Sequence, residues 1–191
     1  RLQEVSKQQA ILAELEQGDV AVVSDAGTPG LNDPGYELVR AALKAGHQVS
    51  PIPGACAPIA ALVASGLPTD SFLYLGYLPR RQSERRQLLQ GIASQASTLV
   101  FLETPHRLQA ALVDLLSVLG DRQIAVAREL TKLHEEIFRG SMHQAHEHFS
   151  VHEPRGEITL VVAGAASLIA QWSEIDLETQ LKLSLDQAEP P

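Results

Sequence analysis

Apolar positions along the chain fall into two patterns, short continuous runs and runs with helical spacing, and their alternation predicts strands followed by helices. The run DVAVVSD is short, continuous and rich in valine, as in strands that are buried in parallel sheets. Glycine-containing loops separate such runs from the helices that follow. The N-terminal part is therefore predicted to contain a helix over 1–17, a strand over 19–25, a helix over 34–45, a strand over 47–54 and a helix over 57–66.

A second series starts at Phe72, after the segment GLPTDS, which we expect to be a domain boundary. Its predicted strands cover 72–79, 97–103, 123–130, 135–140 and 156–164, and its predicted helices cover 83–94, 105–119 and 142–149. Strands that adjoin directly near 130–140 indicate a mixed sheet there. The pattern predicts a two-lobed α/β fold: an N-terminal lobe over 1–70 with a parallel sheet, a C-terminal lobe over 71–165 with a mixed sheet, and a tail or linker over 166–191.

Composition restricts where such a protein works. The 191 residues are 45% hydrophobic, enough for a substantial core. No apolar run approaches the ~20 residues that a membrane-spanning helix needs. A single cysteine, Cys56, excludes an internal disulfide and fits a reducing compartment, so we expect a cytoplasmic protein without membrane contact.

The net charge of −8 argues against broad, non-specific nucleic-acid binding, which usually requires a basic face. Basic residues are nevertheless concentrated in PRRQSERR, between a predicted strand and a predicted helix: Arg80, Arg81, Arg85 and Arg86. Arginine is suited to bidentate phosphate contact, and phosphate contacts dominate affinity for RNA. A solvated helix start with Glu84 as partner is the alternative, but the acidic remainder of the chain favours RNA contact.

Four loops at the ends of predicted strands are candidates for a ligand site, because ligands of open α/β sheets bind beyond the carboxyl ends of strands. The first, SDAGTPG, combines an acid with glycines that let a ligand approach the backbone. It lacks the GxGxxG of dinucleotide sites and the GK[ST] of P-loops, and a tight turn without a ligand explains it equally well. The second, PIPGACA, has small residues that leave room for a flat ring such as adenine; close helix–sheet packing is the alternative.

The other two loops carry charge. In FLETPHR a strand ends at Glu103 and a helix begins, which places His106 and Arg107 beside a helix N-terminus, a favourable place for anions. Glu103 and Arg107 pairing with each other is the alternative. In ARELTK, charged groups including Arg128 and Lys132 follow an apolar strand, either as part of a site or as a solvated edge.

Two further features indicate packing rather than chemistry. Cys56 has no histidine as a sequence neighbour, so a small buried hydrophobic residue is favoured over a nucleophile. Four histidines lie at helical spacings in MHQAHEHFSVHE: His143, His146, His148 and His152. The sequence has no HExxH motif and no cysteine partner for them, so we expect a wet surface helix and assign no metal.

The ordered motifs resemble a known family. SDAGTPGLNDPG, PIPGACA, ETPHRL, ARELTK and RGEITLVV, in this order and spacing, resemble the tetrapyrrole methylase superfamily over nearly all of residues 10–165. Within it they resemble the branch of ribosomal small-subunit RNA 2′-O-methyltransferases, which methylate a cytidine ribose in 16S rRNA. Superfamily members that methylate precorrins usually show G-D-P at the first loop, so Gly27-Thr28-Pro29 after Ser24-Asp25 favours the RNA branch.

The resemblance implies S-adenosylmethionine as methyl donor, bound in a cleft between two lobes, and a homodimer that acts on 16S rRNA of the small ribosomal subunit. The donor contacts that it implies are Asp25, Ala26, Gly27, Thr28, Leu31, Cys56, Ala57, Glu103 and Leu130. Methyl transfer to a ribose hydroxyl needs an aligned nucleophile and help with its proton, for which the candidates are Lys132, His106 and Glu103. Arg107 and Arg128 are expected to bind phosphate with the four arginines above.

The sequence departs from the family at its N-terminal end. Family members begin with a strand, a T-P-I-G-N-L-like loop and an E-D-T-R-like motif; neither motif occurs here, and the sequence opens without Met inside a predicted helix. We therefore expect a shortened N-terminal lobe that lacks part of the active site and binds the donor poorly. Two alternatives stay open: methylation of a tetrapyrrole carbon, and a non-catalytic remnant that binds RNA or protein.

Overall fold

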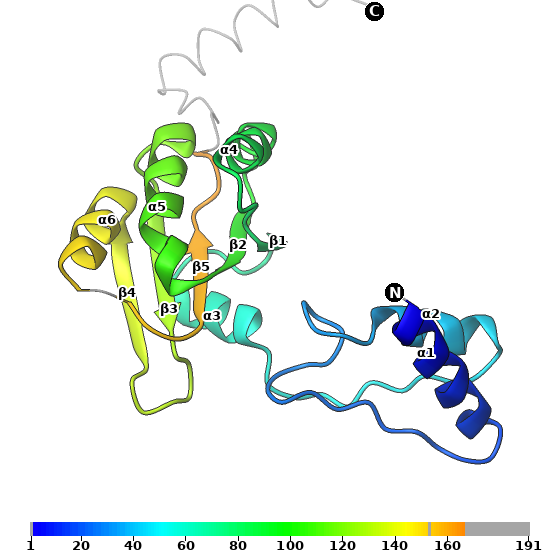
Figure 1. Ribbon diagram of the computed structural model, residues 1–191. Helices are drawn as coiled ribbons and strands as arrows, with labels where there is room; N and C mark the ends of the chain where they lie inside the picture. Colours follow the sequence, from blue (N-terminus) through cyan, green and yellow to red (C-terminus); the bar gives the residue numbers. More distant parts are fainter. Residues whose placement is uncertain (1, 153, 167–191) are drawn as a thin grey trace, which may run out of the picture.

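The computed structural model describes residues 2–152 and 154–166. A five-stranded sheet forms the centre of the C-terminal part, in the order β1-β2-β5-β3-β4 (Figure 1). The strands are β1 (Phe72–Tyr77), β2 (Thr98–Glu103), β3 (Gln123–Arg128), β4 (Glu136–Ser141) and β5 (Ile158–Val162). β1 and β2 are parallel and the other neighbours are antiparallel, which confirms the mixed sheet predicted for this lobe.

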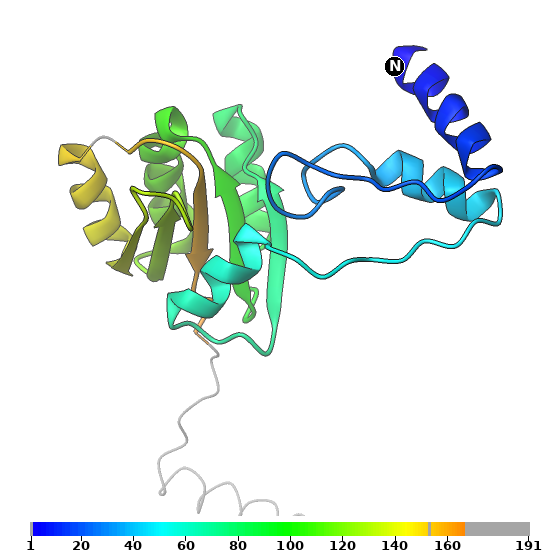
Figure 2. The same ribbon diagram turned by 90° about the horizontal axis from the view of Figure 1, so that it is seen from below.

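The helices are α1 (Leu2–Leu15), α2 (Tyr36–Lys44), α3 (Ala57–Ser65), α4 (Gln82–Gly91), α5 (Pro105–Leu119) and α6 (Met142–Val151). α4, α5 and α6 cover one face of the sheet, and α3 lies on the other (Figure 2). Side chains of β2 alternate between these faces: Leu99 and Phe101 are buried in the larger core with α5, and Val100 in the smaller core with α3. None of the helices among the described residues is both long and apolar enough to cross a membrane.

α3 crosses the strands rather than running along them. One row of register neighbours spans the sheet from β1 to β4: Tyr74, Val100, Val161, Ala125 and Arg139. The Arg139 guanidinium donates to the Ala64 carbonyl near the end of α3 (2.9 Å from Nε), while Ala61 and Leu62 pack on the middle of the row. α3 thus begins on the β1 side of the sheet, where the loop before it can meet other loops.

The N-terminal part differs from the prediction. α1 and α2 lie together, away from the sheet, and two extended segments join them to the C-terminal part (Figure 1). These segments are the predicted strands 19–25 and 47–54, and neither is a strand in the structure. A strand requires a neighbour for its backbone N–H and C=O groups, and neither run has one in the part of the chain that is described. Val23 and Ile52 are accordingly 85% and 91% exposed. The α/β class is confirmed, but the parallel N-terminal sheet is not formed here.

The division into lobes at residue 70 stays a prediction. The segment 66–71 does separate α3 from β1, but α3 packs on the C-terminal sheet although it precedes the boundary. The predicted tail or linker over 166–191 lies outside the described residues beyond 166.

Candidate functional site

The first two predicted loops touch each other. The Thr28 hydroxyl donates to the Ala55 carbonyl (2.9 Å), and a Cβ atom added at Gly27 would lie 3.7 Å from the same oxygen. Gly27 has a φ of 76°, a left-handed conformation that side chains disfavour. The remaining predicted donor contacts of the first loop, Asp25, Ala26 and Leu31, are exposed. Two loops that are 27 positions apart therefore present their backbone and small side chains side by side.

The first loop also contacts β1. The Tyr74 hydroxyl donates to Asn32 Oδ1 (2.5 Å), and Asn32 itself is left-handed, with a φ of 58°. Gly76 lies inside β1 with a φ of 64°, where the register with β2 shifts, and a Cβ there would come within 2.9 Å of Asn32 Nδ2. Sequence reasoning missed these three residues. The signals were a glycine within a predicted strand and the turn sequence NDPG.

The second loop leads into a shallow hollow on α3. Its lining consists of small and aliphatic residues: Gly54, Ala55, Cys56, Ile59, Ala60, Val63 and Ala64. Cys56, at the N-cap of α3, is half-buried and lies close to Tyr74; burial raises the pKa of the Tyr74 phenol, and Cys56 and Tyr77 add to the shift. Leu130 packs against the same smaller core as Tyr74. Cys56 and Leu130, predicted as donor contacts from different lobes, thus adjoin one cluster.

This arrangement fits a nucleoside-type donor. Small side chains of the hollow leave room for a flat ring, the left-handed turn at Gly27 allows close approach to the backbone, and the exposed Asp25 carboxylate is free to accept from hydroxyl groups. The convergence of all four loops on one cleft stays a prediction. β2 and β3 both run antiparallel to β5, so the loops after Glu103 and Arg128 share one edge of the sheet.

Glu103 does not have the predicted geometry. Its side chain is fully buried, accepts from the Thr104 amide (2.7 Å) and from Arg107 Nη2 (3.1 Å), and presents no oxygen at the surface. Burial raises the pKa of Glu103, although the Thr104 amide and Arg107 oppose this shift. The alternative, pairing with Arg107, is present in the structure, and it opposes a contact of this carboxylate with the donor or the acceptor hydroxyl, which stays a prediction.

Lys132 is likewise unsuited to be the base. Its ammonium donates to Glu129 Oε1 (2.9 Å) and Glu157 Oε2 (3.2 Å), and these hydrogen bonds raise the pKa of Lys132. A general base must be neutral near the working pH, so a raised lysine pKa opposes that role. His106 is exposed at the start of α5, with Nε2 3.5 Å from the Thr104 hydroxyl, and of the three catalytic candidates its ring alone reaches solvent without an ion-pair partner among the described residues.

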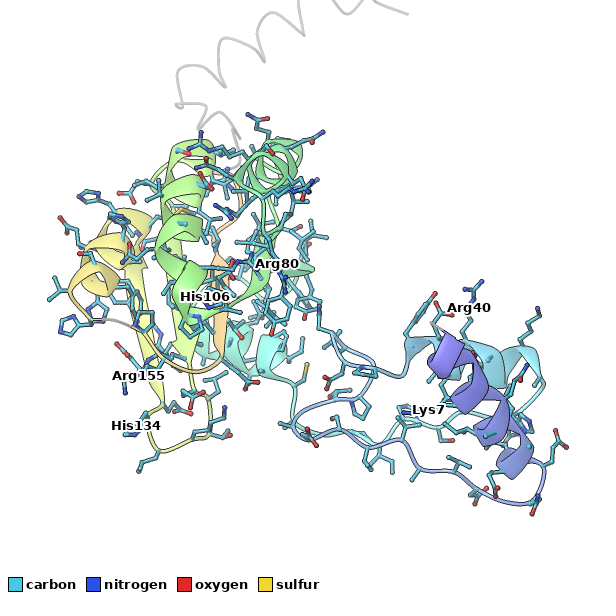
Figure 3. The ribbon with its side chains drawn as sticks, viewed as in Figure 1. Lys7, Arg40, Arg80, His106, His134 and Arg155 are labelled. Carbon is cyan, nitrogen blue, oxygen red and sulfur yellow. The ribbon has the colours of Figure 1, made fainter. Side chains whose placement is uncertain are left out.

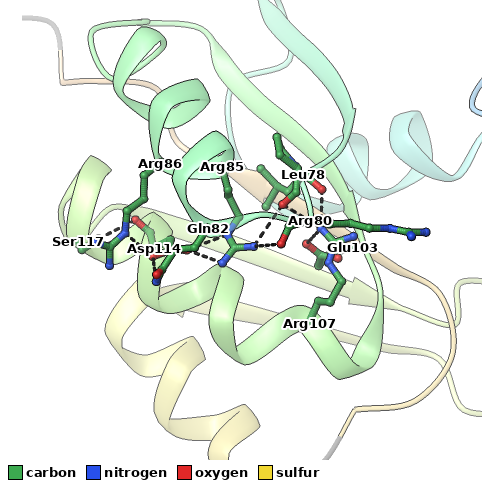
Figure 4. Close-up of polar contacts among 10 residues, drawn as sticks. Leu78, Arg80, Gln82, Arg85, Arg86, Glu103, Arg107, Asp114 and Ser117 are labelled. Atoms are coloured by element: carbon green, nitrogen blue, oxygen red, sulfur yellow. Dashed lines mark hydrogen bonds and ion pairs between the residues drawn. The ribbon is translucent and has the colours of Figure 1, made fainter.

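The four clustered arginines separate into two groups, and Figure 4 shows Arg80, Arg85 and Arg86 of this cluster. Arg80 and Arg81 are exposed, and Arg81 pairs with Glu84 at the surface (3.2 Å). Arg85 is only 5% exposed and binds Asp114 of α5 through Nε (2.8 Å) and Nη2 (2.5 Å). The guanidinium is turned into the protein, which opposes its contact with RNA; that contact stays a prediction.

Arg86 is half-exposed and also binds Asp114, with 2.7 Å between Nε and Oδ1. Burial opposes ionisation of Asp114, but hydrogen bonds from Arg86, Arg85 and Gln82 outweigh it and hold the pKa of Asp114 below its ordinary value. Sequence reasoning missed Asp114, although a carboxylate on the apolar face of a helix signals a buried partner.

Arg107 and Arg128 are also occupied. Arg107 binds Glu103 and the Leu78 carbonyl, and Arg128 binds Glu136 Oε2 through Nη2 (2.8 Å) and Nε (3.0 Å). The predicted role of both in binding phosphate would require them to leave these partners. Figure 3 shows His134 on the loop between β3 and β4, with Arg155 near it, while His106 and Arg80 lie further along the C-terminal part. Within residues 2–152 and 154–166, no three or more candidate ligand side chains gather as a metal site would require.

The sequence is similar to known methyltransferases. Residues 2–146 match the model of the family Tetrapyrrole (Corrin/Porphyrin) Methylases. The Ribosomal RNA small subunit methyltransferase I of Synechocystis sp. is 51% identical over 159 residues, which cover 82% of this chain and 57% of that protein. The chain spans about half the length of the curated relatives it matches, 52–57% for three of them.

Solved structures with the same fold are more distant in sequence. The methyltransferase CobJ superposes with a TM-score of 0.63 at 21% identity, over 85% of this chain and 72% of that one. The uroporphyrin-III C-methyl transferase from Thermus thermophilus, complexed with S-adenyl homocysteine, superposes with a TM-score of 0.54 at 21% identity, over 82% and 71% of the two chains. At this identity the likeness concerns the fold alone.

Proposed function

From the premise that the chain belongs to the tetrapyrrole (corrin/porphyrin) methylase family, we propose that the full-length protein is an S-adenosylmethionine-dependent methyltransferase of small-subunit ribosomal RNA. One observation carries this proposal: 51% identity to a protein named Ribosomal RNA small subunit methyltransferase I. The finer details come from the resemblance of the motifs. They are the 2′-hydroxyl of a 16S rRNA cytidine as acceptor, a homodimer as the active form and the cytoplasm as location.

The donor is proposed to lie between the first and second loops. Gly27 and Thr28 would approach it with their backbone, Asp25 would accept from its ribose hydroxyls, and Cys56 and Ala57 would border its base. Leu31 and Leu130 are the proposed apolar contacts. When bound, the sulfonium supplies a methyl group on an already activated leaving group, so the chain has only to align the acceptor and help it lose a proton.

His106 is the remaining candidate to accept the proton of the acceptor hydroxyl. Glu103 is buried, and the ammonium group of Lys132 is paired with two carboxylates. His106 follows the C-terminal end of β2. The loop after β3 lies at the same end of the sheet. An imidazole nitrogen that is exposed and free of an ion pair among the described residues can accept a hydrogen bond from the acceptor hydroxyl. Arg80 and Arg81 are proposed to bind phosphate groups of the RNA.

The test offers both acceptor classes to the purified full-length protein with tritiated donor: 30S subunits that lack the modification, and uroporphyrinogen III. We expect label in 16S rRNA, recovered in an alkali-resistant dinucleotide because a 2′-O-methyl group blocks cleavage at that position. Label in the tetrapyrrole alone would replace this proposal with the tetrapyrrole alternative. Donor binding without transfer to either acceptor would contradict both.

A further inference from the structure

The loop between β1 and α4 is held from the inside by two guanidinium groups. Arg85 donates to the carbonyls of Pro79 (3.2 Å) and Arg80 (3.4 Å). Arg107 donates to the carbonyls of Leu78 and Pro79, the latter at 3.4 Å. Three consecutive carbonyls of a surface loop therefore accept hydrogen bonds from side chains of α4 and α5.

Each of these guanidinium groups is anchored on a fully buried carboxylate (Figure 4). Asp114 of α5 binds Arg85, and Glu103 at the end of β2 binds Arg107. A buried ion pair is favourable only when its remaining hydrogen-bonding groups are satisfied. Here the carbonyls of the β1–α4 loop accept from Arg85 and from Nη2 of Arg107, whereas the buried Nε of Arg107 has no partner among the described residues. The position of the loop is therefore coupled to both carboxylates, and most fully to Asp114 through Arg85.

The same geometry turns Arg80 outward. Its carbonyl faces Arg85, while its side chain is exposed and points away from the buried carboxylates (Figure 4). Its guanidinium has no hydrogen-bond or ion-pair partner among the described residues, whereas Arg81 has Glu84 and Arg86 has Asp114. β1, which leads into this loop, also carries Tyr74 and its contact with Asn32 of the first loop. Among the described residues, Arg80 is thus a cation without a partner, and it follows the strand that contacts the first loop through Tyr74.

We propose that Asp114 is a positioning residue for the acceptor RNA: acting through Arg85, it fixes the β1–α4 loop so that Arg80 meets a backbone phosphate beside the donor loops. The identity of the ligand as RNA rests on the function proposed above. A cation whose backbone is fixed before binding loses less conformational freedom when it engages phosphate. Release of the loop should therefore weaken RNA binding about three- to tenfold without changing the donor pocket.

The experiment compares Asp114→Asn with the matched control Glu84→Gln, both in the full-length protein. Glu84→Gln removes the exposed partner of Arg81 and leaves the loop carbonyls bound. Arg80→Gln is then added to each protein, and affinity for 30S subunits is measured across salt concentrations below the melting temperature. In the wild type and the control, Arg80→Gln should flatten the log–log salt slope by about 0.7–0.9. In Asp114→Asn it should change the slope little, because Arg80 is already displaced, and donor affinity should stay unchanged.

A purely structural role gives a different result. Asp114→Asn would then lower the melting temperature, but Arg80→Gln would change the salt slope equally in all three backgrounds, and this outcome would overturn the proposal. If Asp114→Asn does not fold, Arg85→Lys replaces it, because lysine keeps the charge near Asp114 but lacks the fork that reaches Pro79 and Arg80.

Tryptic cleavage after Arg80 provides a measurement that needs no RNA. The wild type and Glu84→Gln should be cut slowly, and Asp114→Asn and Arg85→Lys should be cut several-fold faster at this bond. Equal rates would show that Asp114 does not fix the loop. A wild-type protein that binds no 30S subunits at low salt would instead overturn the proposed function, and the cleavage rates would still decide whether Asp114 holds the loop.

Discussion

Removal of the Asp114 carboxylate should be the most destabilising single change in the charged network. Asp114→Ala leaves Arg85, which is 5% exposed, as a buried charge without its partner, and a break of this kind typically costs about 3–5 kcal/mol. Arg86 adds little to this cost, since its side chain is 45% exposed and can be hydrated. A typical domain has only about 5–15 kcal/mol of stability, so this loss is a large fraction of the total.

Urea unfolding followed by circular dichroism measures the effect. With a slope near 2 kcal/mol per molar urea, the expected loss moves the midpoint by roughly 2 M. The control is Glu84→Ala, which breaks the exposed pair with Arg81 and should cost about 0–1 kcal/mol. The double change Arg85→Met with Asp114→Leu should recover much of the loss, because it removes both buried charges. The reasoning is refuted if Asp114→Ala behaves like Glu84→Ala, or if the double variant is no more stable than Asp114→Ala.

Further predictions concern acid stability and the two sites. The pKa of Asp114 is lowered in the folded state, so its contribution is complete above the ordinary value of 3.8 and is lost as the pH falls through the folded value; unfolding between pH 5 and 2 should show a weaker pH dependence in Asp114→Asn. Gly27→Val should abolish donor binding by calorimetry because its φ is 76° and the donor must approach the backbone there; unchanged affinity in a folded variant would contradict this. Lys132→Gln should keep the pH profile of methyl transfer, whereas loss of the rise in rate with increasing pH would restore Lys132 as the base. Gly76→Val should displace Asn32 and speed hydrogen exchange in residues 27–35, and unchanged protection there would show that the contact does not hold the loop.

The C-terminal elements were predictable because each apolar run has clear ends and finds a partner. α5 begins at Pro105 and ends before Gly120, the bounds that the pattern predicts. β3 ends at Arg128, two residues earlier than predicted, because Glu129 adopts a left-handed φ of 51°, far from the extended backbone of a strand. In this part of the chain, errors are confined to the ends of elements.

The charged residues show what sequence alone does not contain. Arg80 and Arg85 are the same residue type in one cluster, and the pattern gives no reason to separate them. Their roles differ because Asp114, 29 positions after Arg85, is buried opposite only one of them. The assignment of a charge to a site or to the core depends on this long-range partner, which has to be placed by the fold.

The N-terminal runs make the same point about apolar residues. Periodicity predicts that Val23 and Ile52 are buried in strands. Both side chains are apolar, as in a buried strand, yet both are exposed because the described residues provide no strand beside them. These side chains adjoin the loops that are proposed to bind the donor. The first loop is therefore anchored to the sheet through Asn32 and Tyr74, while the run before it has no strand to hold it. An interaction that covers Val23 and Ile52 should raise the affinity of the proposed donor site, because it would fix the residues on both sides of Thr28 and Ala55 before the donor binds; calorimetry with Val23→Ser and Ile52→Ser in the full-length protein should then show weaker donor binding.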